Sequence, residues 1–106
     1  MDYEEIIMQI IVNSGNARSH AMNAIGLAKS KNMQEAENEL AKAVDDLNLA
    51  HETQTRLIQD EAAGRSKQVT LLMVHAQDHL MNAITVKDLA QEFIDLYEKL
   101  FTMKMG

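Results

Sequence analysis

An unbroken helical repeat occupies the C-terminal third of the sequence. Between residues 72 and 100, mostly apolar side chains recur at alternating steps of four and three residues without a miss. These positions are Leu72, Ala76, His79, Ala83, Val86, Ala90, Phe93, Tyr97 and Leu100. Such spacing keeps side chains on one face of an α-helix and is typical of coiled-coil packing. The repeat therefore predicts one long helix in this part of the chain.

A second strip runs beside the first along the same predicted helix. Its members are Leu71, Val74, Asp78, Thr85 and Leu89. The helix thus has apolar material for two interfaces, although one suffices inside a single subunit. We expect the surplus strip to pack against other copies of the chain, since a closed ring lets one patch cover itself.

Two earlier segments show the same spacing of apolar side chains, at about residues 3–30 and 33–63, with Gln54 interrupting the stripe of the second. The chain contains no proline and only four glycines, so little in it breaks a helix. With the third helix at about residues 67–102, the sequence predicts an all-α fold, an antiparallel three-helix bundle. Its length suits one domain, residues 1–106.

Several residues are typical of helix ends. Asp2 and Asn32 each precede a glutamate by three residues, which is the spacing of a capping box. Gly64 suits the position after a helix end, and Ser66 is the predicted cap of the third helix.

Two glycines, Gly15 and Gly26, lie inside the first predicted helix. Each costs about 1 kcal/mol relative to alanine in a helix. Close approach of another helix would explain them; the alternative is that both are simply tolerated on the surface.

The overall charge excludes several classes of function. Sixteen acidic and ten basic residues give a net charge of −6, without a cluster of Lys and Arg for a phosphate backbone, so a nucleic-acid partner is not expected. The absence of cysteine excludes disulfides and thiolate chemistry. The acidic N-terminus and the lack of a long apolar run predict a cytoplasmic protein that does not insert into a membrane.

The chemistry-bearing residues concentrate in one turn of the third helix. His75, Asp78 and His79 share a face there, amid apolar neighbours. A hydrolytic zinc site of the H-E-x-x-H type would need glutamate where Ala76 stands, and no second histidine-rich turn supplies further ligands. Two readings remain: histidines that serve only as core or interface groups, and a histidine that accepts a phosphoryl group. The isolated His20 and His51 are expected to be ordinary surface or boundary residues.

A phosphoryl acceptor needs little beyond a placed imidazole. Near neutral pH the ring of a histidine such as His75 is largely uncharged and has a lone pair to attack phosphorus. A group at the other ring nitrogen would fix the tautomer, and Gln77, His79 or a residue of another copy are the candidates.

Several segments together resemble one protein family. The run Val74-His75-Ala76-Gln77-Asp78-His79-Leu80-Met81 is similar to the signature of enzyme IIA of the lactose/cellobiose (N,N′-diacetylchitobiose) class of the bacterial phosphoenolpyruvate-dependent sugar phosphotransferase system. The resemblance extends to Gly15-Asn16-Ala17-Arg18-Ser19 and to residues 50–59. It spans essentially the whole chain.

The resemblance implies a homotrimer of three-helix subunits that acts as a phosphotransferase. His75 would accept a phosphoryl group from phosphorylated HPr and pass it to a cysteine of the IIB component, and so, through the permease IIC, drive uptake of a β-linked disaccharide. Gln77 and His79 would support this transfer. Lactose, cellobiose and chitobiose all remain open as the sugar. The alternative is a non-enzymatic helical interaction module with interface histidines.

The resemblance also implies that Asp78 lies at the trimer three-fold, where three carboxylates meet around a metal ion. Like charges forced together raise the pKa of a carboxyl group or demand a cation. Mg²⁺ suits oxygen ligands better than zinc does, so a structural Mg²⁺ is the expected cofactor.

Overall fold

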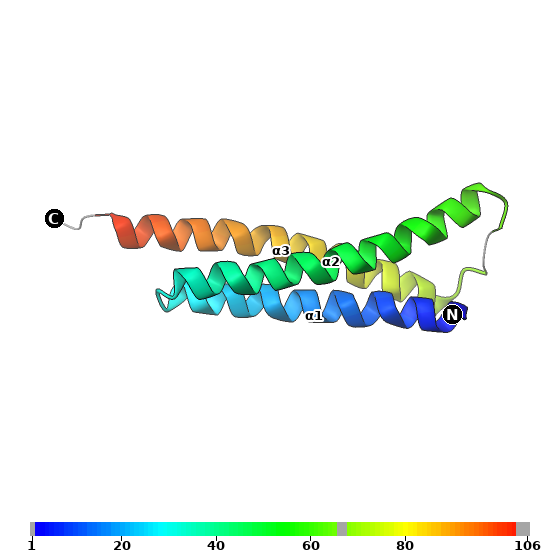
Figure 1. Cartoon of the computed structure of the whole chain (residues 1–106), viewed down its shortest axis with the longest axis horizontal. Coiled ribbons are helices and arrows are strands. Elements are labelled where there is room, and N and C mark those ends of the chain that lie inside the picture. The colour runs from blue at the N-terminus through cyan, green and yellow to red at the C-terminus, as the bar shows by residue number, and fades with distance from the viewer. Residues whose placement is uncertain (1, 66–67, 104–106) are drawn as a thin grey trace.

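Three long α-helices account for nearly all of the described chain. The computed structural model describes residues 2–65 and 68–103, and within them it contains α1 (Tyr3–Lys29), α2 (Met33–Ala62), α3 (Leu71–Thr102) and no strand. Successive helices run in opposite directions and form a rod of 64 × 20 × 19 Å (Figure 1). The predicted all-α antiparallel three-helix bundle is therefore confirmed.

The starts of α1 and α2 follow the prediction, whereas the capping of α2 and the start of α3 differ from it. The Asp2 carboxylate accepts a hydrogen bond from the Glu5 amide at 2.8 Å, as a cap should. Asn32 holds the cap position of α2, but its side chain makes no capping hydrogen bond. The predicted start of α3 at residue 67 is wrong: residues 68–70 are not helical, and Thr70 is the cap.

The turn between α2 and α3 contains a left-handed glycine. Gly64 has a φ of 81°, and its amide donates to the Glu61 carbonyl at 3.1 Å. This backbone conformation favours glycine, so its predicted place after the helix end is confirmed. The Thr70 hydroxyl then accepts from the Met73 amide at 3.1 Å and opens α3. Ser66, the predicted cap, lies outside the described residues.

Alanines at heptad spacing dominate the core. They are Ala17 and Ala24 together with Ala21 and Ala28 on α1, Ala36, Ala43 and Ala50 on α2, and Ala76, Ala83 and Ala90 on α3, all fully buried. Ile7, Ile10, Leu80 and Ile94 are the largest fully buried hydrophobic side chains. Because a methyl group is small, such seams let neighbouring helices pack closely with few aromatic residues.

The buried face of α3 is rotated from the predicted one. Leu80 and Ile94 point into the core, whereas the predicted core residues Phe93 and Leu100 are 43% and 50% exposed. The alanines of the predicted repeat are buried as expected, and His79 is only half-buried. The two apolar strips allowed either face to turn inward. The structure buries the flank of the first repeat that points away from the second strip, where Ala76, Leu80 and Ile94 lie.

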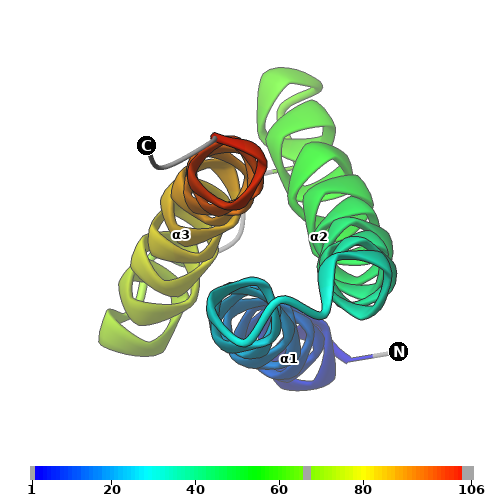
Figure 2. The same cartoon turned by 90° about the vertical axis from the view of Figure 1, so that its left-hand side faces the viewer.

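The bundle opens at one end. α1 packs along both of its neighbours, but α2 and α3 diverge toward the turn that joins them (Figures 1 and 2). No residue of α2 beyond Ala50 is fully buried, and Leu57 is only half-buried. The α2–α3 contact at this end therefore depends on a few side chains.

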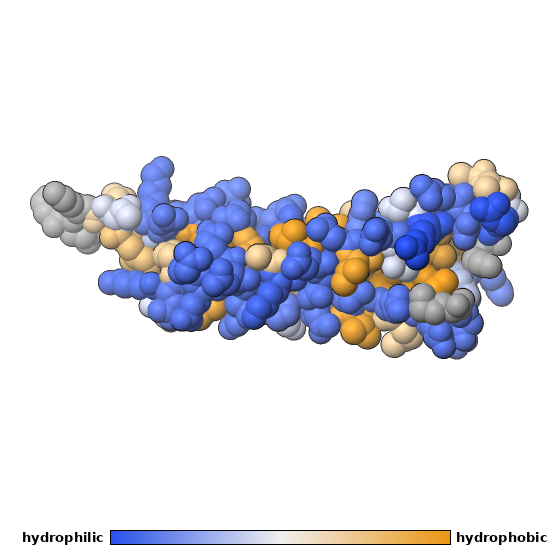
Figure 3. All heavy atoms as spheres, in the orientation of Figure 1, coloured by the Kyte–Doolittle hydropathy of each residue, from blue (hydrophilic) through white to orange (hydrophobic). Residues whose placement is uncertain are grey.

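Much apolar surface remains outside the core, and it appears as patches between hydrophilic side chains (Figure 3). On α3 it includes a band that we call the α3 strip, which consists of Leu71, Val74, Asp78, Met81, Thr85 and Leu89. Every member is exposed, from 85% at Leu71 to about half at the other large apolar residues. The strip is thus free of the core, as the sequence predicted for a surface that binds another copy. None of the described helices carries an apolar run long enough to cross a bilayer.

Candidate functional site

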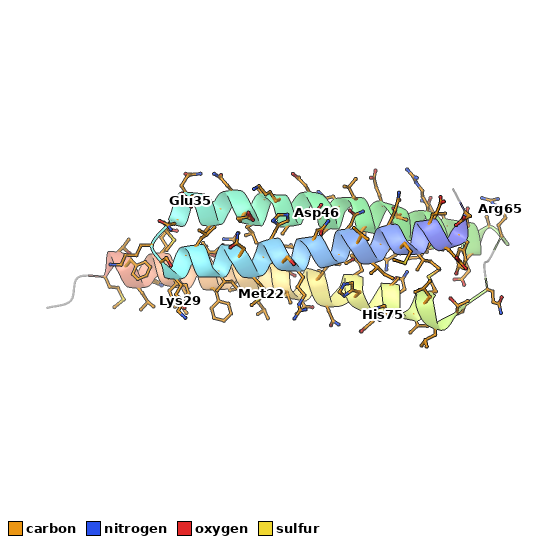
Figure 4. The ribbon with its side chains drawn as sticks, turned by 90° about the horizontal axis from the view of Figure 1, so that it is seen from below. Met22, Lys29, Glu35, Asp46, Arg65 and His75 are labelled. Carbon is orange, nitrogen blue, oxygen red and sulfur yellow. The ribbon has the colours of Figure 1, made fainter. Side chains whose placement is uncertain are left out.

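His75 lies near the N-terminal end of α3, toward the end of the rod where Arg65 lies (Figure 4). The cap at Thr70 sets where the helix starts, and the buried Ala76 sets its rotation. His75 precedes Ala76 by about 100° around the helix, so its side chain is turned away from the core and is exposed. An incoming phosphoryl group can therefore reach this ring.

His79 is the immediate neighbour of His75, one turn further along α3. The two imidazole rings are stacked, with centroids 5.8 Å apart and an angle of 11° between their planes. The ring of His79 is half-buried because it also lies against α1 at Gly15. The close approach predicted at Gly15 is thus confirmed, whereas nothing described lies near the Cβ position of Gly26.

Gln77 points to a different side of the helix. Its side-chain oxygen accepts a hydrogen bond from the Gln54 amide of α2, and its own amide lies 3.7 Å from the Met73 sulfur. The side chain is thus engaged between α2 and α3, where the bundle opens. Gln54 interrupts the apolar stripe of α2, and this polar residue was the one sign in the sequence of a polar contact here. The sequence alone does not identify Gln77 as its partner.

Asp78 is exposed on the α3 strip. In residues 2–65 and 68–103, no three His, Cys, Asp or Glu side chains come together in a way that would hold a metal ion. Within these residues, one chain therefore offers fewer than three such ligands at Asp78. Further carboxylates around a metal ion there would come from other copies of the chain.

An apolar hollow of about 300 Å³ adjoins the turn that carries His75. It is lined chiefly by apolar side chains from the start of α1, the end of α2 and the start of α3, with Val74 and Gln77 at the histidine-bearing turn. His75 itself does not line the hollow. Around α3, Val74 lies about 100° and Gln77 about 160° from His75, so the hollow opens on a different side of the helix from the exposed ring.

The two remaining histidines lie apart from this cluster. His20 links α1 to α2: its Nδ1 is 2.8 Å from Glu39 Oε2, and its Nε2 is 3.7 Å from Asp46 Oδ2. This hydrogen bond to His20 is the main cause that lowers the pKa of Glu39. The expectation of an ordinary surface or boundary residue is confirmed for both histidines: His51 is exposed, and the partly exposed His20 lies at the boundary between α1 and α2. A single sequence does not show which residues face His20 across the helices.

Comparison with known proteins places the chain in a family. The family model described as "PTS system, Lactose/Cellobiose specific IIA subunit" matches residues 5–98. The lichenan-specific phosphotransferase enzyme IIA component of Bacillus subtilis is 58% identical over 99 residues, which cover 93% of this chain and 90% of that protein.

Solved structures agree with this match. The crystal structure of the cellobiose-specific enzyme IIA from Bacillus anthracis superposes with a TM-score of 0.93 at 54% identity, over 98% of this chain and 96% of that one. A solution structure of the IIA(Chitobiose)-HPr complex gives 0.85 at 38% identity, over 96% and 99%. The chain therefore belongs to the lactose/cellobiose-specific IIA subunits of the sugar phosphotransferase system.

Proposed function

We propose that this protein is a phosphocarrier that receives a phosphoryl group from phosphorylated HPr on His75 and passes it to a cysteine of a IIB component. The observation that carries the proposal is the exposed imidazole of His75 in a chain of this family. Support for HPr as the donor comes from a structural relative that was solved as a IIA(Chitobiose)-HPr complex.

The proposed chemistry conserves the phosphoryl group through two displacements. The lone pair of the neutral His75 ring attacks phosphorus, a P–N bond forms at His75, and the P–N bond to the donor histidine of HPr breaks. A thiolate of IIB then attacks the same phosphorus, which forms a P–S bond and returns the electron pair to the His75 ring. Positioning dominates such transfers. A ring held on a rigid helix and stacked on His79 meets that requirement.

Both partners have to reach the same ring in turn. We infer that HPr and IIB use overlapping surfaces around the exposed His75. Among the candidates for fixing the His75 tautomer, His79 stacks on the ring, whereas Gln77 is hydrogen-bonded to Gln54. A role of Gln77 toward His75 would therefore be indirect, through the shape of the turn.

The working unit is proposed to be a homotrimer packed through the α3 strip. Leu71, Val74 and Leu89 leave apolar surface exposed there, and burial of such surface favours association. Asp78 lies within this strip, so a three-fold axis through it would bring three carboxylates together. Oxygen ligands of this kind fit Mg²⁺, which would neutralise their charge when bound. Its proposed role is assembly and not the transfer itself.

A labelling experiment tests the function. The wild-type protein, incubated with phosphoenolpyruvate, enzyme I and HPr, should acquire one acid-labile, base-stable phosphoryl group per chain. His75→Ala should abolish the label with the helical fold retained, and His79→Ala should slow labelling less severely. His51→Ala is the matched control, because it removes an exposed histidine outside the cluster and should change nothing.

The labelling result also distinguishes a phosphocarrier from a non-enzymatic helical interaction module. A helical interaction module would acquire no label from phosphorylated HPr, so an unlabelled wild-type protein would contradict the phosphocarrier function. Labelling that survives in His75→Ala would show that another residue is the nucleophile.

The relatives suggest the class of sugar that the system takes up. Most of their names refer to lichenan, cellobiose, oligo-beta-mannoside or N,N′-diacetylchitobiose, and one names galactose. From the majority we propose a β-linked disaccharide. Comparing the rates of phosphoryl transfer to IIB components of the different systems tests this choice. The fastest acceptor identifies the system, and preference for a IIB that serves an unrelated sugar would contradict it.

A further inference from the structure

The contact between α1 and His79 assigns a role to a residue that carries no side chain. A Cβ atom added to Gly15 would lie 3.4 Å from His79 Nε2. The half-buried ring of His79 therefore occupies the space that a side chain at this position of α1 would otherwise fill. Gly26, on the same helix, has no described atom within 4 Å of its Cβ position.

The ring of His79 also stacks on the ring of His75. Its ring lies 5.8 Å from that of His79, and the two planes differ by only 11°. Aromatic rings at this separation interact favourably. A displacement of His79 by α1 would therefore be passed directly to the ring that faces solvent.

We propose that Gly15 is a positioning residue for phosphoryl transfer: its missing side chain leaves a slot in α1 for the His79 imidazole, which holds the ring of His75 in place. This inference rests on the proposed function of His75. It also accounts for a glycine inside a long helix, where alanine would form the helix better.

The size of the slot gives a graded prediction. At 3.4 Å a methyl group only touches the ring, so Gly15→Ala should label within about twofold of the wild-type rate. A β-branched side chain is stiff about χ1 in a helix and cannot swing its methyl groups freely away. Gly15→Val should therefore displace His79 and slow labelling by phosphorylated HPr about tenfold or more, because small misplacements at a reacting centre lower rates steeply.

Two comparisons show whether the effect passes through His79. Gly26→Val adds the same side chain to the same helix without a contact and should leave the rate unchanged. In a His79→Ala background the clash is absent, so adding Gly15→Val should slow labelling no further than His79→Ala alone. Equal effects of the two glycine variants, or an undiminished effect of Gly15→Val without His79, would overturn the inference.

A spectroscopic measurement keeps this test separate from the test of the function itself. The imidazole NMR signals of His75 and His79 should shift in Gly15→Val and stay in place in Gly26→Val. This result is independent of HPr, so a wild-type protein that takes no label would overturn the proposed function while the spectra still decide the role of Gly15. Gly15→Ser, with one atom beyond Cβ, provides a milder variant if Gly15→Val does not fold. Unmoved signals in both variants would contradict the slot.

Discussion

Replacing Ser14 by alanine should stabilise the protein. Ser14 is completely buried in α1, and among the described residues its hydroxyl has no hydrogen-bond partner. A buried hydroxyl without a partner costs about 1–3 kcal/mol. Alanine also forms a helix better than serine by about 0.5 kcal/mol. The free energy of unfolding should therefore rise by about 1.5–3.5 kcal/mol per chain in Ser14→Ala.

Ser19→Ala isolates the burial contribution. Ser19 lies on the same helix but is exposed, so its replacement should yield only the helix-propensity gain of about 0.5 kcal/mol. Urea unfolding followed by circular dichroism measures both variants, at one fixed protomer concentration because association adds to apparent stability. If Ser14→Ala gained no more than Ser19→Ala, or lost stability, the hydroxyl would have to be satisfied in the folded protein, and the reasoning would be refuted.

Three further predictions concern the core, the hydrogen bond between His20 and Glu39, and the α3 strip. Leu80→Ala should lower the free energy of unfolding by about 2–5 kcal/mol, measured in urea, because Leu80 is fully buried. The hydrogen bond to His20 lowers the pKa of Glu39 in the folded state, so the stability that Glu39 contributes is present at neutral pH and is lost as the pH falls through its folded-state pKa. Between about pH 5 and pH 3, the wild type should therefore lose stability more steeply than Glu39→Gln when both are denatured at a series of pH values. Parallel curves for the two proteins would count against this. Asp78→Leu should keep or strengthen the trimer in sedimentation, since apolar packing often replaces buried charge without loss, and monomers would argue against a place on the axis.

The helices were predictable because their signals are local. Apolar spacing and the lack of proline determine where helices run, and Asp2 met the local rules for a cap. The start of α3 was misplaced because both Ser66 and Thr70 are good caps by composition. The choice depends on the extended backbone at Thr70, which has a ψ of 167°, and a sequence motif does not specify that conformation.

The rotation of α3 was harder to predict for a different reason. Two apolar strips lie side by side on this helix, so periodicity alone permits either strip, or a face next to one of them, to turn inward. Packing against α1 and α2 makes the choice, and it places Leu80 and Ile94 in the core. The same rotation leaves His75 exposed and His79 half-buried, so the accessibility of the site was not readable from spacing.

At the candidate site, the sequence pointed to the right turn but not to its neighbours. His75, Asp78 and His79 stood out because polar groups interrupt an apolar helix. The contact of His79 with Gly15 and the hydrogen bond between Gln54 and Gln77 join residues far apart in the chain. Such pairings depend on how the helices are aligned along the rod, which no single helix encodes.

The alanine seams make the width of the rod a shared property of all three helices. Ala43 and Ala83, for example, are both completely buried, so neither helix has room to take up a larger neighbour. A bulky residue in place of any one of these buried alanines would push the neighbouring helices apart over several turns. Its effect would reach the distance between α1 and His79 without touching the histidine. Replacing one of these alanines by a larger residue, even far from His75, would thus lower the rate of phosphoryl transfer at His75.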